Sequence, residues 1–285
     1  MNRPANAASP LPLWALRALW VVIGTLAPWT AAVDERSTAV RAVAMAWGWS
    51  LWAVVLFSLL VPAAVSLTVV RAVMPLAFAA SIADGRAGVI ALVLLTWVVA
   101  SLPDTADSLV QGGAYGSETR FLLRTPMTYV LPTLLAMTVQ GITLLGGTLL
   151  LAARQWVTGG VLTVLGLVLL RTVPRQLHRL SRRWLVLVPA GMVVHDHMVL
   201  AETMMLRMAN VTGMSMTTAN GEAADLTGGV LGPRISVTAR EADKVILSRI
   251  TAKVLGTGEA LHVQAFTVAP RRTAVALRML GGTRS

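Results

Sequence analysis

The sequence has no cysteine and little charge, and both absences narrow what the protein can be. Without cysteine, disulfide scaffolds, thiolate metal sites, iron–sulfur ligation and thiol catalysis are excluded. Charged residues make up only 13%, whereas a soluble domain has about 25%. Hydrophobic residues reach 55% and the mean hydropathy is +0.70. The composition predicts an integral membrane protein, and it excludes disordered and collagen-like chains.

Acidic residues are scarce, and the resulting positive charge is unevenly distributed. The formal net charge is +11. Residues 12–174 hold nine arginines against six acidic residues, whereas residues 175–285 hold fourteen arginines and lysines against seven. The sequence therefore divides into an apolar half and a basic, polar half.

Long apolar runs occupy the first half of the chain. A membrane-spanning helix needs about 20 apolar residues. The run 42–83 is long enough for two such helices with a turn near Val61-Pro62, and a polar turn at Asp84-Gly85-Arg86 follows it. Six spans are predicted. Five is the alternative, if 42–70 is one tilted helix and the segment after Arg71 lies at the membrane interface. The other four runs are 11–33, 88–102, 127–153 and 156–173.

The densest positive cluster follows the last apolar run. Four arginines fall within residues 175–183, which predicts that this end lies in the cytoplasm. Six spans would place the N-terminus and the loop 103–126 on the same side. We expect a plasma-membrane protein with a transmembrane helical domain (1–174), a basic juxtamembrane segment (175–184, hereafter the basic segment) and a cytoplasmic domain (185–285).

After Trp184 the apolar residues follow a period of two, which is typical of strands. Thr238-x-x-Glu241 has the form of a helix capping box, so a helix is predicted over 239–252, with a strand as the alternative. Pro270 suits the first turn of a terminal helix that reaches about Leu280. These patterns predict a small α+β domain of antiparallel strands closed by a C-terminal helix. The predicted strands are 184–188, 192–195, 203–207, 211–217, 235–238 and 261–268.

Two stretches resemble a known group of proteins. The stretch HRLSRRWLVLVPAGMVVHD at 178–196 is similar to the segment after the last span in a group of uncharacterised actinobacterial polytopic membrane proteins. The loop YGSETRFLLRTP at 115–126 is similar to their loop Tyr-Gly-x-Glu-x-Arg-Phe-x-Leu-Arg-x-Pro. More loosely, the strand–Gly–strand opening at 185–194 and the final helix resemble bacterial pleckstrin-homology-like domains, which implies a small β-barrel. A helix at 239–252 does not fit that scheme.

The basic segment is the first candidate site. If it is helical, its arginines share one face and its leucines the other, so the segment would lie along the membrane surface. Anionic headgroups would then bind the arginines. The alternative is that the positive charge only sets the membrane topology. The candidate lipid contacts are Arg175, Arg179, Arg182 and Arg183.

The loop 103–126 is the second candidate. We expect its ionic side chains to pin the loop and to dock it on the polar domain, through Tyr115, Glu118, Arg120 and Arg124. A less favoured alternative is a membrane-embedded enzyme that uses Asp104, Asp107 and Glu118 on a lipid-linked substrate. Two carboxylates alone rarely make a specific metal site.

Polar residues inside the spans are the third candidate. Arg71 lies in the middle of the predicted span 62–83, and charged residues at such depth often mark functional sites. It is the basis for a second alternative, a transport or permease component. Gln140 is expected to hydrogen-bond to a neighbouring helix. His195-Asp196-His197 is interpreted as a polar turn in which Asp196 caps backbone amides, rather than as a metal site.

The function that the sequence favours is a scaffold. We expect an integral membrane scaffold or regulatory protein, with no catalysis, whose membrane-apposed cytoplasmic domain binds a protein partner. No motif indicates a catalytic, metal or cofactor site. Nucleic acid is not expected as a partner, because the basic residues adjoin the bilayer and aromatic residues are nearly absent from 185–285.

Overall fold

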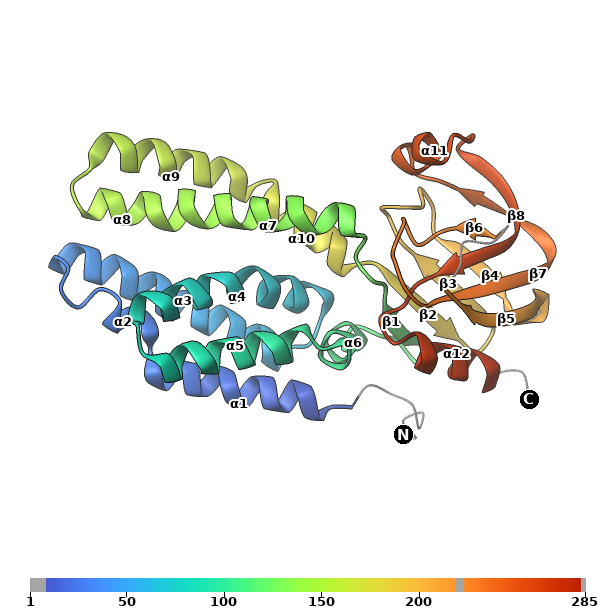
Figure 1. The fold of residues 1–285 in the computed structure, drawn as a ribbon, viewed down its shortest axis with the longest axis horizontal. Coiled ribbons are helices and arrows are strands. Elements are labelled where there is room, and N and C mark those ends of the chain that lie inside the picture. The colour runs from blue at the N-terminus through green and yellow to red at the C-terminus, as the bar shows by residue number, and fades with distance from the viewer. Residues whose placement is uncertain (1–8, 219–222, 283–285) are drawn as a thin grey trace. The chain divides into compact units, whose positions relative to one another are not determined.

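The computed structural model describes residues 9–218 and 223–282, and the chain forms two compact units. The helical unit comprises Ser9–Gly112 and Leu131–His178. The sheet unit comprises Gly113–Val130 and the chain from Arg179 onward. The predicted boundary near 174 therefore holds only in part, because Gly113–Val130 leaves the helices to join the sheets. Figure 1 shows the sheet unit mainly in orange and red.

The helical unit contains apolar helices separated by short turns (Figure 1). Pro62 lies in the break between two of them, and Gly85 makes another turn with a φ of 78°. Both turns were predicted. The helices are α1 (Leu11–Leu26), α2 (Pro28–Ala31), α3 (Thr38–Leu60), α4 (Ala64–Asp84), α5 (Ala87–Ser101), α6 (Pro103–Gln111), α7 (Met127–Gly141), the π-helical turn η1 (Ile142–Gly146), α8 (Gly147–Ala152), α9 (Trp156–Leu170) and α10 (Val173–Ser181).

Five helical stretches among the described residues are long and apolar enough to cross a membrane, so the chain is a multi-pass membrane protein. They are Leu11–Ala31, Thr38–Leu60, Ala64–Asp84, Met127–Ala152 and Trp156–Ser181. The predicted span at 88–102 is α5, which has only 15 residues and is followed by α6 at a bend of 61°. The proposed single helix over 42–70 is wrong, because the chain breaks between α3 and α4.

Reciprocal hydrogen bonds hold α1 against α3. The indole Nε1 of Trp20 donates to the carbonyl oxygen of Trp52, and the Nε1 of Trp52 donates to the carbonyl oxygen of Trp20, each at 2.9 Å. A side chain at Gly24 would collide with the Trp52 ring. Near the other end of the helix pair, Arg17 donates from Nε and Nη2 to the carbonyl oxygen of Leu59 at 3.0 and 2.8 Å. Arg17 thus satisfies a backbone acceptor that the end of α3 leaves unpaired.

Glycines allow α8 and α9 to pack closely. A Cβ atom at Gly147 would lie 2.6 Å from the backbone nitrogen of Thr163, and one at Gly159 would lie 2.6 Å from that of Leu151. Their neighbours Gly146 and Gly160 have open space at the same position. Only one glycine of each pair therefore permits the close approach that small residues give membrane helices.

The sheet unit contains two four-stranded sheets, with the strand orders β1-β2-β3-β4 and β5-β7-β8-β6. Neighbouring strands are antiparallel except for the two-residue β6, which runs parallel to β8. The first strand comes from the loop between α6 and α7. The elements are β1 (Thr119–Leu122), β2 (Trp184–Val188), β3 (Gly191–His195), β4 (Met204–Arg207), the 3₁₀ turn η2 (Met208–Asn210), β5 (Val211–Thr217), β6 (Ala224–Asp225), β7 (Arg234–Ile246), α11 (Arg249–Leu255), β8 (Ala260–Val268) and α12 (Thr273–Gly282).

One hydrophobic core joins both sheets and the terminal helix. Phe121 from β1 and Phe266 from β8 are both at most 1% exposed and belong to the same cluster. Ala276 and Leu280 of α12 complete it. Alternate residues enter this core in β2, β3 and β4, such as Leu185 and Leu187, and this period of two predicted these strands. β5 and β8 depart from strict alternation where their pairing with β7 changes register.

The helix predicted over 239–252 is wrong, and the strand alternative holds for its first part. β7 continues through Ile246 because it pairs with both β5 and β8, although the β8 register shifts between Thr238 and Asp243. Helix α11 begins only at Arg249, where the Ser248 hydroxyl accepts a hydrogen bond from the backbone nitrogen of Thr251. Similarly, α12 begins at Thr273 rather than at the predicted Pro270.

The paired glycines of α8 provide a matched test. We expect Gly147→Ala to lower the stability of the protein, because overpacking typically costs about 1–3 kcal/mol. Gly146→Ala should be neutral or stabilising, since alanine favours helix by about 1 kcal/mol and meets no neighbour. Thermal unfolding of the full-length protein in detergent would measure both. Equal melting temperatures for the two variants would contradict the close approach.

Candidate functional site

The basic segment begins as a helix, as the sequence predicts. Arg175 and Arg179 lie on α10 with exposed side chains, whereas Leu177 and Leu180 are partly buried. Arg182 follows the end of the helix and is also exposed. Because residues four apart share a helix face, the arginines form a positive stripe.

Arg171 extends this stripe and was missed from the sequence. It is exposed and precedes Arg175 by four residues, directly after α9. The spacing of four residues between Arg171 and Arg175 is the signal in the sequence from which Arg171 could have been predicted. The sequence interpretation assigned Arg171 to the last apolar run instead.

The stripe carries charge that the protein itself does not neutralise. Within residues 9–218 and 223–282, no carboxylate lies within ion-pair distance of Arg171, Arg175, Arg179 or Arg182. The Nη2 of Arg179 contacts the carbonyl oxygen of His197 at 3.5 Å, a weak hydrogen bond. These guanidinium groups are therefore free to bind external anions.

Arg183 does not belong to this stripe, and its predicted lipid contact is wrong. Its side chain is 1% exposed. Nε donates to Oδ1 of Asp196 at 2.8 Å and Nη2 donates to Oδ2 at 2.7 Å, a bidentate pair. The same guanidinium donates to the carbonyl oxygens of Arg124 at 2.9 Å and Thr227 at 3.4 Å. Arg183 thus ties together distant segments of the sheet unit.

The His195-Asp196-His197 turn is held by a backbone hydrogen bond and by contacts between rings. Oδ1 of Asp196 accepts a hydrogen bond from the backbone nitrogen of Met198 at 3.1 Å, which confirms the predicted backbone cap. The rings of His195 and His197 meet edge to face at 4.2 Å, and His195 stacks on Trp184 at 5.3 Å. In the described part of the chain, no three His, Asp or Glu side chains gather as metal ligands would.

The predicted loop contacts lie within the sheet unit. In β1, Arg120 is the register partner of Val186 in β2. Its guanidinium bonds to Glu118 Oε1 at 2.5 Å and lies 5.0 Å from the centroid of the Trp184 ring. Glu118 also accepts from the backbone nitrogen of Tyr115 at 2.6 Å, while the Tyr115 side chain is 85% exposed. The segment is therefore a strand of the sheet and more than a surface loop.

Arg124 occupies a crowded positive environment next to this strand. Its Nη1 donates to the carbonyl oxygen of Leu231 at 2.8 Å, whereas Nε and Nη2 are buried with no hydrogen-bond partner. Burial, and then the positive charge of Arg234, lower the pKa of Arg124. Arg234 in turn lies 3.7 Å from Asp225. Arg124 is positioned by the sheet unit rather than by a carboxylate of its own.

Gln140 and Arg71 are the two polar residues predicted inside the spans. Gln140 Nε2 donates to the carbonyl oxygen of Gly166 at 3.0 Å, which confirms the predicted bond to a neighbouring helix. Arg71 is partly buried in α4, and it is absent from the lining of the large cavity of the helical unit. That lining is almost entirely apolar, so the cavity does not support a transport role based on Arg71.

The three carboxylates proposed for an enzyme belong to different units of the chain. Asp104 and Asp107 lie on α6, and Oδ1 of Asp104 accepts from the backbone nitrogen of Ser9 at 3.4 Å. Asp107 is 2% exposed. Glu118 belongs to the sheet unit and pairs with Arg120.

Removing one partner of the buried ion pair should destabilise the protein strongly. We expect Asp196→Asn to cost about 3–5 kcal/mol, because it leaves the Arg183 guanidinium buried without its counter-charge. Asp243→Asn, at a carboxylate outside the ion pairs of the described residues, is the control. Thermal unfolding in detergent would compare the two variants. Similar melting temperatures would show that the pair contributes little.

His195 should make stability depend on pH. Burial, followed by the charges of His197 and Arg182, lowers the pKa of His195 from 6.5 to about 4. Its Nε2 is buried without a hydrogen-bond partner, and its Nδ1 lies 3.1 Å from the Thr203 hydroxyl. The unfolded chain binds the His195 proton more tightly than the folded chain does. Neutral His195 therefore contributes to the free energy of unfolding above pH 6.5, and this contribution is lost as the pH falls toward 4.

A pair of variants would isolate this effect. His195→Gln should flatten the decline of the melting temperature between pH 6.5 and 4. His262→Gln, at an exposed position of β8, should leave the decline as in the parent protein. Melting curves across this pH range would measure both. A decline unchanged in His195→Gln would assign the pH dependence to other groups.

Known proteins give no further guide to these sites. Comparison of the chain with protein-family models, with curated proteins and with solved structures finds no match. The resemblances in the loop 115–126 and the stretch 178–196 therefore stay predictions. What the protein does must be inferred from its own residues and their geometry.

Proposed function

We propose that the chain is an integral scaffold or regulatory protein of the plasma membrane, with the sheet unit on the cytoplasmic side as its protein-interaction module. One observation carries this proposal: exposed arginines at helical spacing follow an apolar span and have no carboxylate partner among the described residues. Positive charge next to a span favours the cytoplasmic side. Anionic headgroups are the complementary charge available there.

Amphipathic geometry supports lipid binding at the same place. On α10, exposed Arg175 and Arg179 alternate with partly buried Leu177 and Leu180. A helix of this kind places its arginines at the level of the headgroups and its leucines toward apolar surroundings. Each arginine near an anionic surface contributes about 1 kcal/mol. The basic segment would then fix the point at which the chain passes from membrane to sheet.

Edge strands support protein interaction by the sheet unit. β4 and β5 each lie at the edge of their sheet, so among the described residues one side of each strand has no neighbouring strand. Met205 on β4 and Met216 on β5 are 51% and 54% exposed. Methionine side chains adapt to varied apolar surfaces, and an unpaired edge can accept an added strand. The partner that this surface favours is an extended segment of another protein.

Neutralising the stripe tests the lipid part of the proposal. We expect the full-length variant Arg175→Gln/Arg179→Gln/Arg182→Gln to bind phosphatidylglycerol about 100-fold more weakly, since three arginines each contribute about 1 kcal/mol. Native mass spectrometry of detergent-solubilised protein titrated with phosphatidylglycerol or phosphatidylcholine would measure the retention of each lipid.

The matched control removes the same charge elsewhere. Arg207→Gln/Arg240→Gln/Arg278→Gln changes three exposed arginines of the sheet unit outside the basic segment. We expect this control to retain phosphatidylglycerol like the parent protein. An equal loss in both triple variants would reduce the effect to net charge, and no preference of the parent protein for phosphatidylglycerol would contradict lipid binding at the basic segment.

A further inference from the structure

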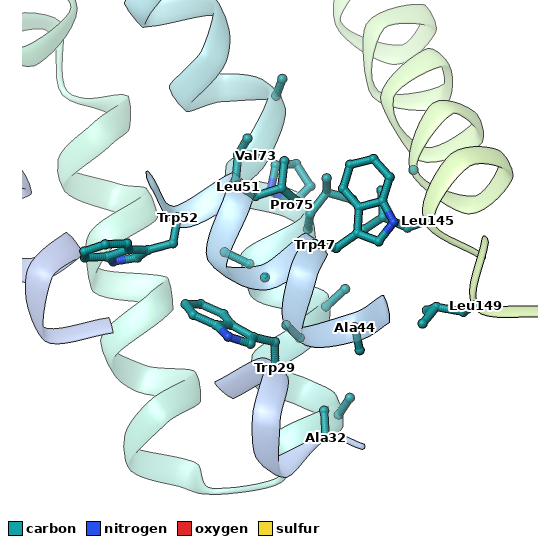
Figure 2. Close-up of a pocket in the computed structure, with 18 of the residues that line it drawn as sticks. Trp29, Ala32, Ala44, Trp47, Leu51, Trp52, Val73, Pro75, Leu145 and Leu149 are labelled. Atoms are coloured by element: carbon teal, nitrogen blue, oxygen red, sulfur yellow. The ribbon is translucent and has the colours of Figure 1, made fainter. Parts of the chain in front are cut away.

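The helical unit contains a cavity of about 530 Å³ between α2, α3, α4 and the α7–α8 stretch (Figure 2). Small residues create it. The lining includes Ala44 on α3 and Ala77 and Ala80 on α4, where larger side chains would reduce the space, whereas the Trp29 ring already occupies the side-chain position of Gly48. Tryptophans form much of the remaining wall. In a membrane such an apolar space is suited to a hydrocarbon chain and not to water.

One tryptophan of this wall lacks a hydrogen-bond partner. Four tryptophans line the cavity. Trp20 and Trp52 donate to each other's carbonyl oxygens, and Nε1 of Trp47 donates to the Thr148 hydroxyl at 2.9 Å. Trp29 is only 9% exposed, and its Nε1 is buried with no partner in the described chain. An indole N–H can only donate, so the occupant that satisfies it must supply an acceptor oxygen.

A polar pocket adjoins the apolar cavity. It has a volume of about 440 Å³, and Asp34, Glu35 and Arg36 line it. Ala32 and Ala83 belong to the walls of both spaces. Ala32 follows Trp29 by three residues, about one helical turn. The combined site is thus apolar on one side and charged on the other, with the unpaired indole in the apolar wall.

The dimensions fit one lipid chain. On α4 the lining extends from Ala72 to Ala83, which is about 17 Å at 1.5 Å per residue. Half of the hydrocarbon core of a bilayer is about 15 Å thick. A chain that enters beside Ala83 would therefore reach roughly the bilayer midplane within the cavity.

We propose that this site binds one phospholipid with an ammonium-bearing headgroup. Its hydrocarbon chain fills the cavity, and an ester oxygen accepts the hydrogen bond from Trp29. The ammonium group pairs with Asp34 and Glu35, while the phosphate pairs with Arg36. Arg36 and Arg41, whose Nη2 lies 3.6 Å from Oδ1 of Asp34, balance the charge of the two carboxylates, so a headgroup without net charge fits this pocket.

The site is separate from the basic segment. The hydrogen bond from Trp47 to Thr148 places the first half of α3 beside the last part of the α7–α8 stretch (Met127–Ala152). The loop with Asp34 therefore lies at the same end of the helical unit as the α8–α9 turn, whereas Arg171 lies at the opposite end of α9. The two proposed lipid contacts belong to opposite leaflets, and each can fail without the other.

Lipid competition with the full-length protein tests the proposal. Native mass spectrometry in detergent would compare phosphatidylethanolamine, phosphatidylcholine and phosphatidylglycerol with identical acyl chains. The competition uses the variant Arg175→Gln/Arg179→Gln/Arg182→Gln, which lacks the proposed phosphatidylglycerol contacts of the basic segment. In this variant we expect one phosphatidylethanolamine to be retained at about tenfold lower concentration than the others, because the trimethylated head of phosphatidylcholine has no N–H donor and phosphatidylglycerol has no cation.

Three variants test which residues bind the ester oxygen, the headgroup and the hydrocarbon chain of the lipid. Trp29→Phe keeps an aromatic ring and should weaken binding of all three lipids about fivefold. Asp34→Asn/Glu35→Gln should remove the preference for phosphatidylethanolamine over phosphatidylcholine. Ala80→Leu should abolish binding by filling the cavity. The matched controls are Trp156→Phe and Ala91→Leu, both exposed and outside the lining, which should bind like the parent protein.

Several results would overturn the proposal. Equal retention of the three lipids by the variant Arg175→Gln/Arg179→Gln/Arg182→Gln would mean an unselective lipid annulus. A dimer that Ala80→Leu dissociates would mean that a second copy of the chain fills the cavity. Unchanged binding in Trp29→Phe and in Asp34→Asn/Glu35→Gln would exclude the site even if Ala80→Leu fails to fold.

Discussion

The buried ion pair between Arg183 and Asp196 is the interaction on which the sheet unit depends. It joins the first residue before β2 to the first residue after β3, so it closes the β2–β3 hairpin at its open end. Through the carbonyl oxygens of Arg124 and Thr227 it also holds the segment after β1 and the segment after β6. A buried charge that loses its partner is far more costly than an exposed one. Four segments of the chain must therefore be in place together.

Much of the fold can be predicted where one periodic signal dominates. Long apolar runs identify the spans, and alternation identifies strands such as Trp184–Val188 and Val211–Thr217. The segment 239–246 fits helical and extended spacing, and the strand forms because Ala239 pairs with β5 and residues 243–246 pair with β8. β1 is hidden in a polar loop, because its partner lies more than sixty residues later and no local pattern shows this. Sequence periodicity predicts local structure, but it does not predict which distant strands pair.

The candidate sites also divide into those that a periodic pattern predicts and those that long-range packing decides. Helical spacing predicted Arg175 and Arg179 as exposed, and it failed at Arg183, where the chain changes from helix to strand. There the side chain points into the unit toward an acid thirteen residues away. The apolar cavity had no signal at all in the sequence, because Ala77 and Ala80 belong to an ordinary apolar run. A void depends on which small residues oppose one another across helices, and this is a property of packing.

The origin of β1 has a consequence for biosynthesis. Thr119–Leu122 leaves the ribosome before α7, α8 and α9, whereas its partner Trp184–Val188 follows them. The segment of β1 therefore has no pairing strand while the last two apolar stretches are inserted into the bilayer. The two strands can pair only if the hairpin of these two apolar stretches returns the chain to the side of the membrane on which Thr119 lies. Completion of the sheet thus reports that the final transmembrane hairpin has been inserted with the correct orientation, and a chain with a failed insertion would keep an open β-strand edge for cellular quality control to detect.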